Sequence, residues 1–118
     1  MKNGPAIRLY ASITLALALF AVLVQAKPSP RTFTGVVTDG ECADGNHSGM
    51  RMGNTAAECA KACVEYHGAA LVLYDGKRSL GLDNQKLAMT FAGEKVTVVG
   101  TLDEGSGTIA LATIERAK

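Results

Sequence analysis

Five short segments with alternating or β-branched apolar residues constrain the fold of this 118-residue chain more than any other feature. Residues 32–39 (TFTGVVTD), 95–102 (KVTVVGTL) and 108–115 (TIALATIE) follow a period close to two, which predicts strands with one apolar face. Residues 69–74 (AALVLY) and 78–82 are separated by an Asp-Gly-Lys turn and predict a β-hairpin. The chain is therefore expected to be rich in β-structure.

Two helices are expected among these strands. Residues 55–67 begin with the Thr-x-x-Glu pattern of a capping box and are followed by a glycine, which predicts an alanine-rich helix after the glycine-rich loop 40–54. Residues 85–91 predict a second, short helix. This order predicts a mainly β (α+β) fold, an OB-like five-stranded antiparallel barrel with a cysteine-bearing helix inserted between strands 1 and 2. A generic antiparallel meander with a helix packed on it is the alternative.

Residues 1–26 have the three parts of a secretory signal peptide. Lys2 and Arg8 precede an apolar run at positions 11–24, and a small-residue cleavage signal ends at Ala26. The run is short for a membrane-spanning helix, although an uncleaved anchor is the alternative interpretation. We therefore expect residues 1–26 to be removed and the protein to be exported to the periplasm or the extracellular space.

The remaining chain, with a leader at 27–31 and a single domain at 32–118, has a nearly balanced charge. Without Lys2 and Arg8, 10 of the 12 basic residues remain against 11 acidic residues. There is no basic stripe, so we expect no nucleic-acid partner and no stable membrane insertion after cleavage. The aromatic side chains that remain are Phe33, Tyr66, Tyr74 and Phe91.

Three cysteines and a histidine, all between positions 42 and 63, carry the clearest chemistry of the chain. Cys59 and Cys63 lie at i and i+4 of the predicted helix, so both point to one face. Their Cβ atoms would be about 5–6 Å apart, beyond the ~3.8 Å that a disulfide prefers, whereas two ligands of one ion fit this spacing. The loop can bring Cys42 and His47 over that face, giving three sulfurs and one imidazole for a tetrahedral Zn²⁺ site. The leading interpretation is a non-enzymatic exported protein that binds zinc or copper through this cluster.

Further donors lie close to these four residues. Met50 and Met52 add thioethers, which favour Cu⁺, and His67, one turn past Cys63, can serve as a fourth or outer ligand. Nearby carboxylates can supply oxygen ligands, although Asp in a glycine-rich loop is typical of turn chemistry. These acidic residues are Asp39, Glu41 and Asp44.

Two other interpretations of the cysteines stay open. Exported proteins form disulfides, so Cys42 can bridge to Cys59 or Cys63, and closing that loop would stabilise the domain by about 3 kcal/mol. The protein would then be a structural or interaction module with a cell-envelope partner and no metal. The third interpretation is thiol redox or sensing, with Cys59 or Cys63 activated by the helix and Lys61. No CxxC, phosphate-loop or nucleophile-elbow motif is present, and the protein is not expected to be an enzyme.

Several motifs of the chain resemble a group of small exported bacterial proteins of unknown function that are common in acidobacteria. The motifs are a strand with D-x-x-C (35–42), a C-x-x-x-C helix (59–64), a Leu-x-Asn-Gln segment (82–85) and a closing Gly-x-x-Val-x-Val-x-Gly-Thr-Leu strand (93–102). The resemblance covers nearly the whole chain after the signal peptide. It implies an OB-like β-barrel and supplies no activity.

Overall fold

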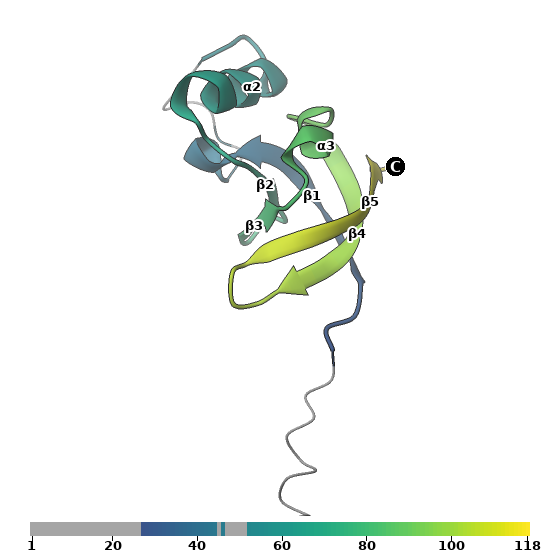
Figure 1. The fold of residues 1–118 in the computed structure, drawn as a ribbon. Coiled ribbons are helices and arrows are strands. Elements are labelled where there is room, and N and C mark those ends of the chain that lie inside the picture. The colour runs from purple at the N-terminus through teal and green to yellow at the C-terminus, as the bar shows by residue number, and fades with distance from the viewer. Residues whose placement is uncertain (1–26, 45, 47–51) are drawn as a thin grey trace, which may run out of the picture.

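The computed structural model describes residues 27–44, 46 and 52–118, and its order of elements is the predicted one (Figure 1). The strands are β1 (Arg31–Asp39), β2 (Leu71–Tyr74), β3 (Ser79–Leu82), β4 (Lys95–Asp103) and β5 (Thr108–Arg116), and the helical elements are η2 (Gly40–Cys42), α2 (Ala56–His67) and α3 (Gln85–Met89). The fold is mainly β with few helices, as predicted. The proposed signal peptide lies outside the described residues, and Arg31, expected to end the leader, already belongs to β1.

The five strands form one mixed sheet whose hydrogen-bonded order is β1-β2-β3-β5-β4. Because β4 also pairs with β1, the ladder closes on itself. Four of the pairings are antiparallel, but β3 and β5 run parallel, with Gly81 opposite Thr108 and Leu82 opposite Ile109. The expectation of a wholly antiparallel sheet is therefore wrong at this pairing. The helix α3 and the strand β4 intervene between β3 and β5, so β5 arrives in the same direction as β3.

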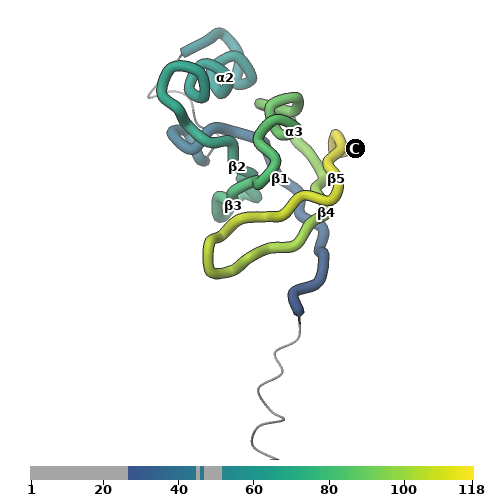
Figure 2. Tube along the Cα trace, in the orientation of Figure 1, coloured from purple at the N-terminus to yellow at the C-terminus, as the bar shows by residue number. Residues whose placement is uncertain are grey.

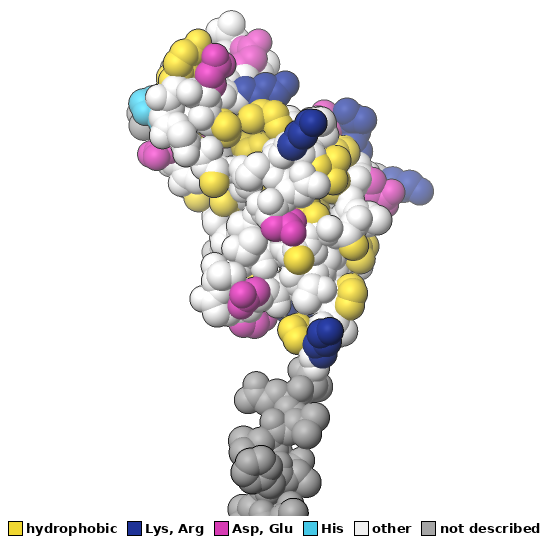
Figure 3. Space-filling model, viewed as in Figure 1, with side chains coloured by type: hydrophobic (Ala, Val, Ile, Leu, Met, Phe, Trp, Pro, Cys, Tyr) yellow, Lys and Arg dark blue, Asp and Glu magenta, His cyan; other side chains and the backbone are white. Residues whose placement is uncertain are grey.

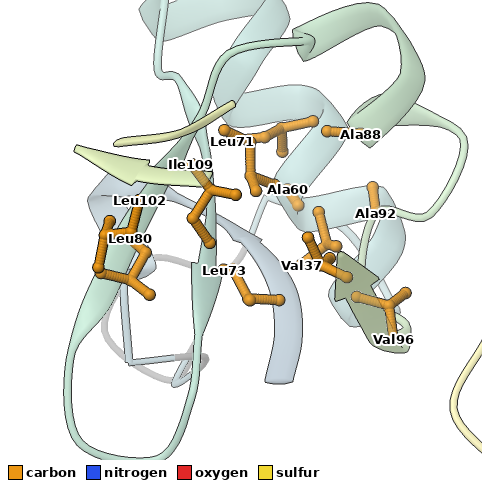
Figure 4. Packing of buried hydrophobic residues seen from close by; sticks show 12 residues of the cluster. Val37, Ala60, Leu71, Leu73, Leu80, Ala88, Ala92, Val96, Leu102 and Ile109 are labelled. Carbon is orange, nitrogen blue, oxygen red and sulfur yellow. The ribbon is translucent and has the colours of Figure 1, made fainter. Parts of the chain in front are cut away.

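The alternation of the strands sorts their side chains between the core and the surface. In β4 every second residue is buried from Val96 to Leu102, and both apolar residues that β2 presents inward, Leu71 and Leu73, are fully buried. Ile109 of β5 lies in the same cluster, which Figure 4 shows from close by. The two helices add small residues to this core: Ala60 from α2 and Ala88 from α3.

Helix α2 has the predicted caps. The Thr55 hydroxyl accepts a hydrogen bond from the Glu58 amide (3.1 Å), and Glu58 Oε2 accepts one from the amide of Asn54 (2.8 Å). At the other end Gly68 adopts φ +65°, the left-handed conformation that closes a helix at low cost for glycine. The helix lies at the end of the closed sheet opposite the β4–β5 turn (Figures 1 and 2).

The beginning of α2 packs closely against the turn that precedes β4, and Gly93 in that turn makes this contact possible. Its φ is +78°, and a Cβ atom at this position would lie 2.5 Å from the Ala57 amide nitrogen. Only a residue without a side chain allows this approach. The cysteine-bearing helix is therefore seated on the end of the sheet by direct backbone packing as well as by its buried face.

No helix among the described residues is both long enough and apolar enough to cross a membrane.

Candidate functional site

The three cysteines come from two chain segments and are all buried. Cys42 ends η2, directly after β1, whereas Cys59 and Cys63 lie on the inner face of α2. Their exposed fractions are 5%, 1% and 0%, respectively. Both helix cysteines are on the buried face, as the i, i+4 spacing predicts.

Two buried polar residues at the end of β1 hold Cys42 in position. Asp39 Oδ1 accepts hydrogen bonds from the amides of Glu41 (3.0 Å) and Cys42 (2.9 Å), which makes it the N-cap of η2. The Thr38 hydroxyl donates to the carbonyl oxygen of Cys42 (2.9 Å). Thr38 and Asp39 have exposed fractions of 0%. Their hydrogen bonds therefore fix the Cys42 backbone from both sides.

Met52 approaches both helix cysteines from the loop that precedes α2. Its amide donates to Cys59 Sγ (3.5 Å), and its Sδ lies 3.9 Å from Cys63 Sγ. Of the two methionines expected to be accessory donors, Met52 is therefore close to the thiols. Met50 and His47 lie outside the described residues.

The three thiols and Asp39 form one interacting cluster, named here the thiol–Asp39 cluster. The Cys42 thiol is hydrogen-bonded to the sulfur of Cys59, and the Cys63 thiol lies within hydrogen-bonding reach of the Asp39 carboxylate. The charge of Asp39 acts on both Cys42 and Cys63. Residues from the end of β1 and from α2, which are distant in the sequence, thus share one buried environment.

Burial and neighbouring negative charge raise the pKa of two of these thiols. Burial is the main cause of the raised pKa at Cys42, followed by Asp39 and Cys59. At Cys63 burial raises the pKa to about 11, again with further contributions from Asp39 and Cys59. Both thiols therefore hold their protons at neutral pH. A reactive thiolate needs the opposite shift, so this environment disfavours thiol redox chemistry at Cys63.

The remaining candidates are placed less favourably. His67 is exposed at the C-terminal end of α2, whereas Cys63, one turn before it, is buried. Among residues 27–44, 46 and 52–118, no three His, Cys, Asp or Glu side chains are placed to coordinate one ion. Within the same residues no disulfide joins the cysteines.

Two residues that matter here carried weak or no sequence signals. Asp39 looked like one turn carboxylate among several, and its signal was only its place directly after an alternating strand. Gln85 marked merely the start of a short helix, yet its amide group binds the backbone of Leu71 through both polar atoms. Such roles depend on neighbours that are distant in the sequence.

A shallow hollow of about 440 Å³ lies elsewhere on the sheet, between β1, the β2–β3 turn and β4. Tyr74, Asp75 and Lys95 contribute side chains of mixed character to it. Basic and acidic groups are interspersed on the face shown in Figure 3. The hollow has no convergent set of titratable or metal-ligating groups among its lining residues, so the thiol–Asp39 cluster is the stronger candidate.

The chain matches no protein-family model, no curated protein and no solved structure.

Proposed function

We propose that this protein is an exported, non-enzymatic metal-binding protein that holds a soft transition-metal ion, Zn²⁺ or Cu⁺, through Cys42, Cys59 and Cys63. The observation that carries the proposal is the convergence of three buried thiols from two segments on one another and on Asp39. The sequence offers His47 as the fourth ligand. Export itself rests on the signal-peptide pattern of residues 1–26.

The physical reason is that the three thiolates are more stable around a bound metal ion than they are without one. Three buried sulfurs repel one another once they lose their protons, because little water screens their charges, and a nearby carboxylate adds to the repulsion. A bound cation reverses the sign of that interaction and keeps the thiolates together. The amide of Met52 already donates to Cys59 Sγ, the kind of outer hydrogen bond that orients metal ligands.

Ion binding would draw the two segments toward each other. Because the described side chains do not yet stand at ligand spacing, the thiols must approach a common point as the ion enters. We therefore expect metal affinity and folding stability to be coupled.

The fold proposal that accompanies this function is an OB-type barrel. It is supported by the strand order β1-β2-β3-β5-β4, the closure of β4 on β1, and a helix between β3 and β4. In OB barrels the loop between strands 1 and 2 flanks the ligand face. The cysteine-bearing loop and helix occupy that connection here.

Metal uptake tests the proposal directly. The protein, reduced and handled without oxygen, is expected to bind one Zn²⁺ or Cu⁺ per chain and to melt at a higher temperature with the ion than without it. Replacing Cys42, Cys59 or Cys63 by Ser should weaken binding by roughly a hundredfold or more, because loss of a direct ligand costs more than loss of an outer contact.

His67→Ala is the matched control, because it removes an exposed imidazole from the same helix. This variant should bind as the wild type does. The proposal fails if the wild-type protein takes up neither ion and its melting temperature does not move.

A disulfide-stapled module is the second candidate, and one observation favours a specific pairing. Because the Cys42 thiol is hydrogen-bonded to Cys59, oxidation would join these two sulfurs in a disulfide. Cys63 would then remain reduced. Two protons and two electrons would pass to an oxidant of the export compartment. Alkylation of the non-reduced protein followed by peptide mapping should then label Cys63 alone, whereas three labelled cysteines would exclude this candidate.

A further inference from the structure

We infer that the edge of β1 around Thr34, together with the hollow beside it, is a docking site for the C-terminal end of an extended peptide. None of the residues that line the hollow belongs to the thiol–Asp39 cluster. The inference therefore goes beyond the proposed metal binding and does not depend on it. The occupant is the end of another protein chain, with its free carboxylate beside Lys95.

One edge of β1 is left open because its neighbour β2 is much shorter. β1 has nine residues and β2 has four, and the two strands pair only from Val36, opposite Tyr74, to Asp39. Residues 31–35 pair with β4 on their other side, and no strand among the described residues pairs with their free edge. An open edge of this kind is a template for the addition of a further strand.

The alternation of an antiparallel ladder shows which backbone groups this edge offers. The amide of Val37 donates to the carbonyl oxygen of Glu94 (3.0 Å), and the carbonyl oxygen of Val37 accepts from the Gly93 amide (2.7 Å). Val37 therefore faces the β4 side, and because successive residues face opposite edges, Thr34 and Thr32 face the open edge. Both are exposed, so each can donate one backbone hydrogen bond to an added strand and accept one from it.

The hollow marks the place where an added strand must end. It measures about 440 Å³ and is lined by Thr34, Val36 and Gly76, among others. Gly76 would lie opposite Thr34 if the ladder of β1 and β2 continued, but the chain has already left β2 at Tyr74. A Cβ atom on Gly76 would meet no described atom within 4 Å, so this position borders open space. From Val36 onward β2 occupies the edge, so a strand along residues 31–35 has its end in the hollow.

Charge selects the carboxyl end of the occupant. Asp75 lines the hollow, but its Oδ1 already accepts from the amides of Lys77 and Arg78 (2.9 Å each), and its Oδ2 lies 3.7 Å from Arg78 Nε. Lys95 also lines the hollow, is exposed, and forms no ion pair with another described residue. Its ammonium group attracts a terminal carboxylate and repels a terminal amine. The added strand therefore has its carboxyl end near Val36 and runs parallel to β1.

The walls of the hollow favour an apolar side chain at the end of the peptide. Val36 and Tyr74 both line it, and both are half-buried. A branched aliphatic side chain and an aromatic ring together offer apolar surface that one further side chain can cover. The occupant is thus an extended segment that ends in an apolar residue with a free carboxylate.

Fluorescence anisotropy with two pentapeptides tests the inference. Both carry the label at the N-terminus, alternate Thr and Val and end in Val, but one ends in a free carboxylate and the other in an amide. We expect the free-carboxylate peptide to bind about tenfold more tightly, because it alone makes a charge-assisted contact. Lys95→Met should lower its affinity to that of the amide. Lys86→Ala, which removes an exposed ammonium group from α3, should bind as the wild type does.

Two further measurements test the addition of a strand. Thr34→Pro removes an amide from the open edge, and it should keep the ladder with β4 because the bonds to β4 come from the residues on either side. We expect T34P to fold and to lose peptide binding. In the wild-type protein, hydrogen exchange at the Thr32 and Thr34 amides should slow by about fivefold or more when the peptide is added. This exchange measurement decides the matter if T34P does not fold.

Each part of the inference has a result that would overturn it. The docking of a chain end is wrong if neither peptide binds, if both bind equally, or if K95M still distinguishes them. Strand addition is wrong if the bound peptide leaves exchange at Thr32 and Thr34 unchanged. A dimer in which these amides are protected without peptide would show that a second copy occupies the edge. All these outcomes leave the metal proposal untouched, since it is tested by metal uptake alone.

Discussion

Among the individual side chains, Gln85 fastens α3 to the beginning of β2. Its Oε1 accepts from the Leu71 amide (2.7 Å), and its Nε2 donates to the carbonyl oxygens of Leu71 (2.9 Å) and Leu82 (2.7 Å). One side chain thus completes the hydrogen bonding of a buried strand end, where unpaired backbone groups are costly. This explains why a Gln at this point matters to the packing of α3.

We predict that Gln85→Ala lowers the free energy of unfolding by about 2–3 kcal/mol, because its hydrogen bonds are lost and buried backbone groups lose their partners. Lys86→Ala, at the exposed neighbouring position, should change it by less than about 0.5 kcal/mol. Urea unfolding of both variants measures the difference. Equal stability of the two variants would show that solvent satisfies the Leu71 backbone.

Sequence reasoning about single side chains succeeds where local spacing decides and fails where distant neighbours decide. The i, i+4 spacing correctly places Cys59 and Cys63 on one face of α2, because helix geometry alone sets that relation. The burial of Asp39 was not predictable, because an Asp-Gly pair after a strand looks the same in a solvated turn. Its surroundings come from the packing of α2, a later segment of the chain, against the end of β1.

Among the secondary-structure elements, β1 changes partners along its length, and Gly35 lies directly before the point of change at Val36. Residues 31–36 of β1 pair with β4, whereas residues 36–39 pair with β2. A Cβ atom on Gly35 would lie 2.2 Å from the carbonyl oxygen of Tyr74, which belongs to β2. The close approach of two backbones therefore requires glycine here.

Gly35→Ala is predicted to destabilise the fold by about 2–3 kcal/mol, because the clash is with backbone and can be relieved only by parting β1 from β2. Gly40→Ala is the control, since its Cβ atom would meet the carbonyl oxygen of Ala70 at 3.4 Å, an ordinary contact. Thermal unfolding of both variants makes the comparison. A G35A protein as stable as G40A would mean that the sheet relaxes there without cost.

The aspartates of two hairpin turns make the stability of the folded state depend on pH. Hydrogen bonds from backbone amides, first of Arg78 and then of Lys77, lower the pKa of Asp75 in the β2–β3 turn. In the β4–β5 turn the amide of Gly105 has the same effect on the pKa of Asp103. Because both pKa values are lower in the folded state, these carboxylates stabilise it above their unfolded pKa of about 4, and this contribution disappears as the pH falls through the folded values.

The double variant D75N/D103N should therefore lose less stability than the wild type between about pH 5 and pH 2. Asn can still accept a hydrogen bond in both turns, so the variant removes the titration while it keeps the turn geometry. Urea midpoints across this range provide the measurement. Parallel curves for the two proteins would show that the turn carboxylates have no part in acid unfolding.

The positions of the strands were predictable because the alternation of apolar residues marks each of them. The pairing of the strands was only partly predictable. The segment 95–102 was expected as a strand, and β4 spans Lys95–Asp103 with every second side chain buried. The parallel pairing of β3 with β5 was missed, because nothing in either segment specifies a partner so far along the chain. Closure of the whole ladder decides that pairing.

In the molecule as a whole, a closed sheet supports a cysteine-bearing loop and helix at one end (Figure 1). The central apolar cluster contains none of the cysteines, since it is made of aliphatic side chains, with members from all five strands. The thiol–Asp39 cluster joins α2 to the end of β1 outside that cluster. A metal ion or a disulfide at this cluster would thus fasten α2 to the end of the sheet.

The most direct test is the intact mass of the protein, purified without reductant, measured first under native and then under denaturing conditions. We predict a native mass that includes one Zn²⁺ or Cu⁺ ion, and a denatured mass with all three thiols after the ion leaves on acidification. A mass two hydrogens lower, with no metal and a single alkylatable cysteine, would contradict the metal site and establish the disulfide in its place.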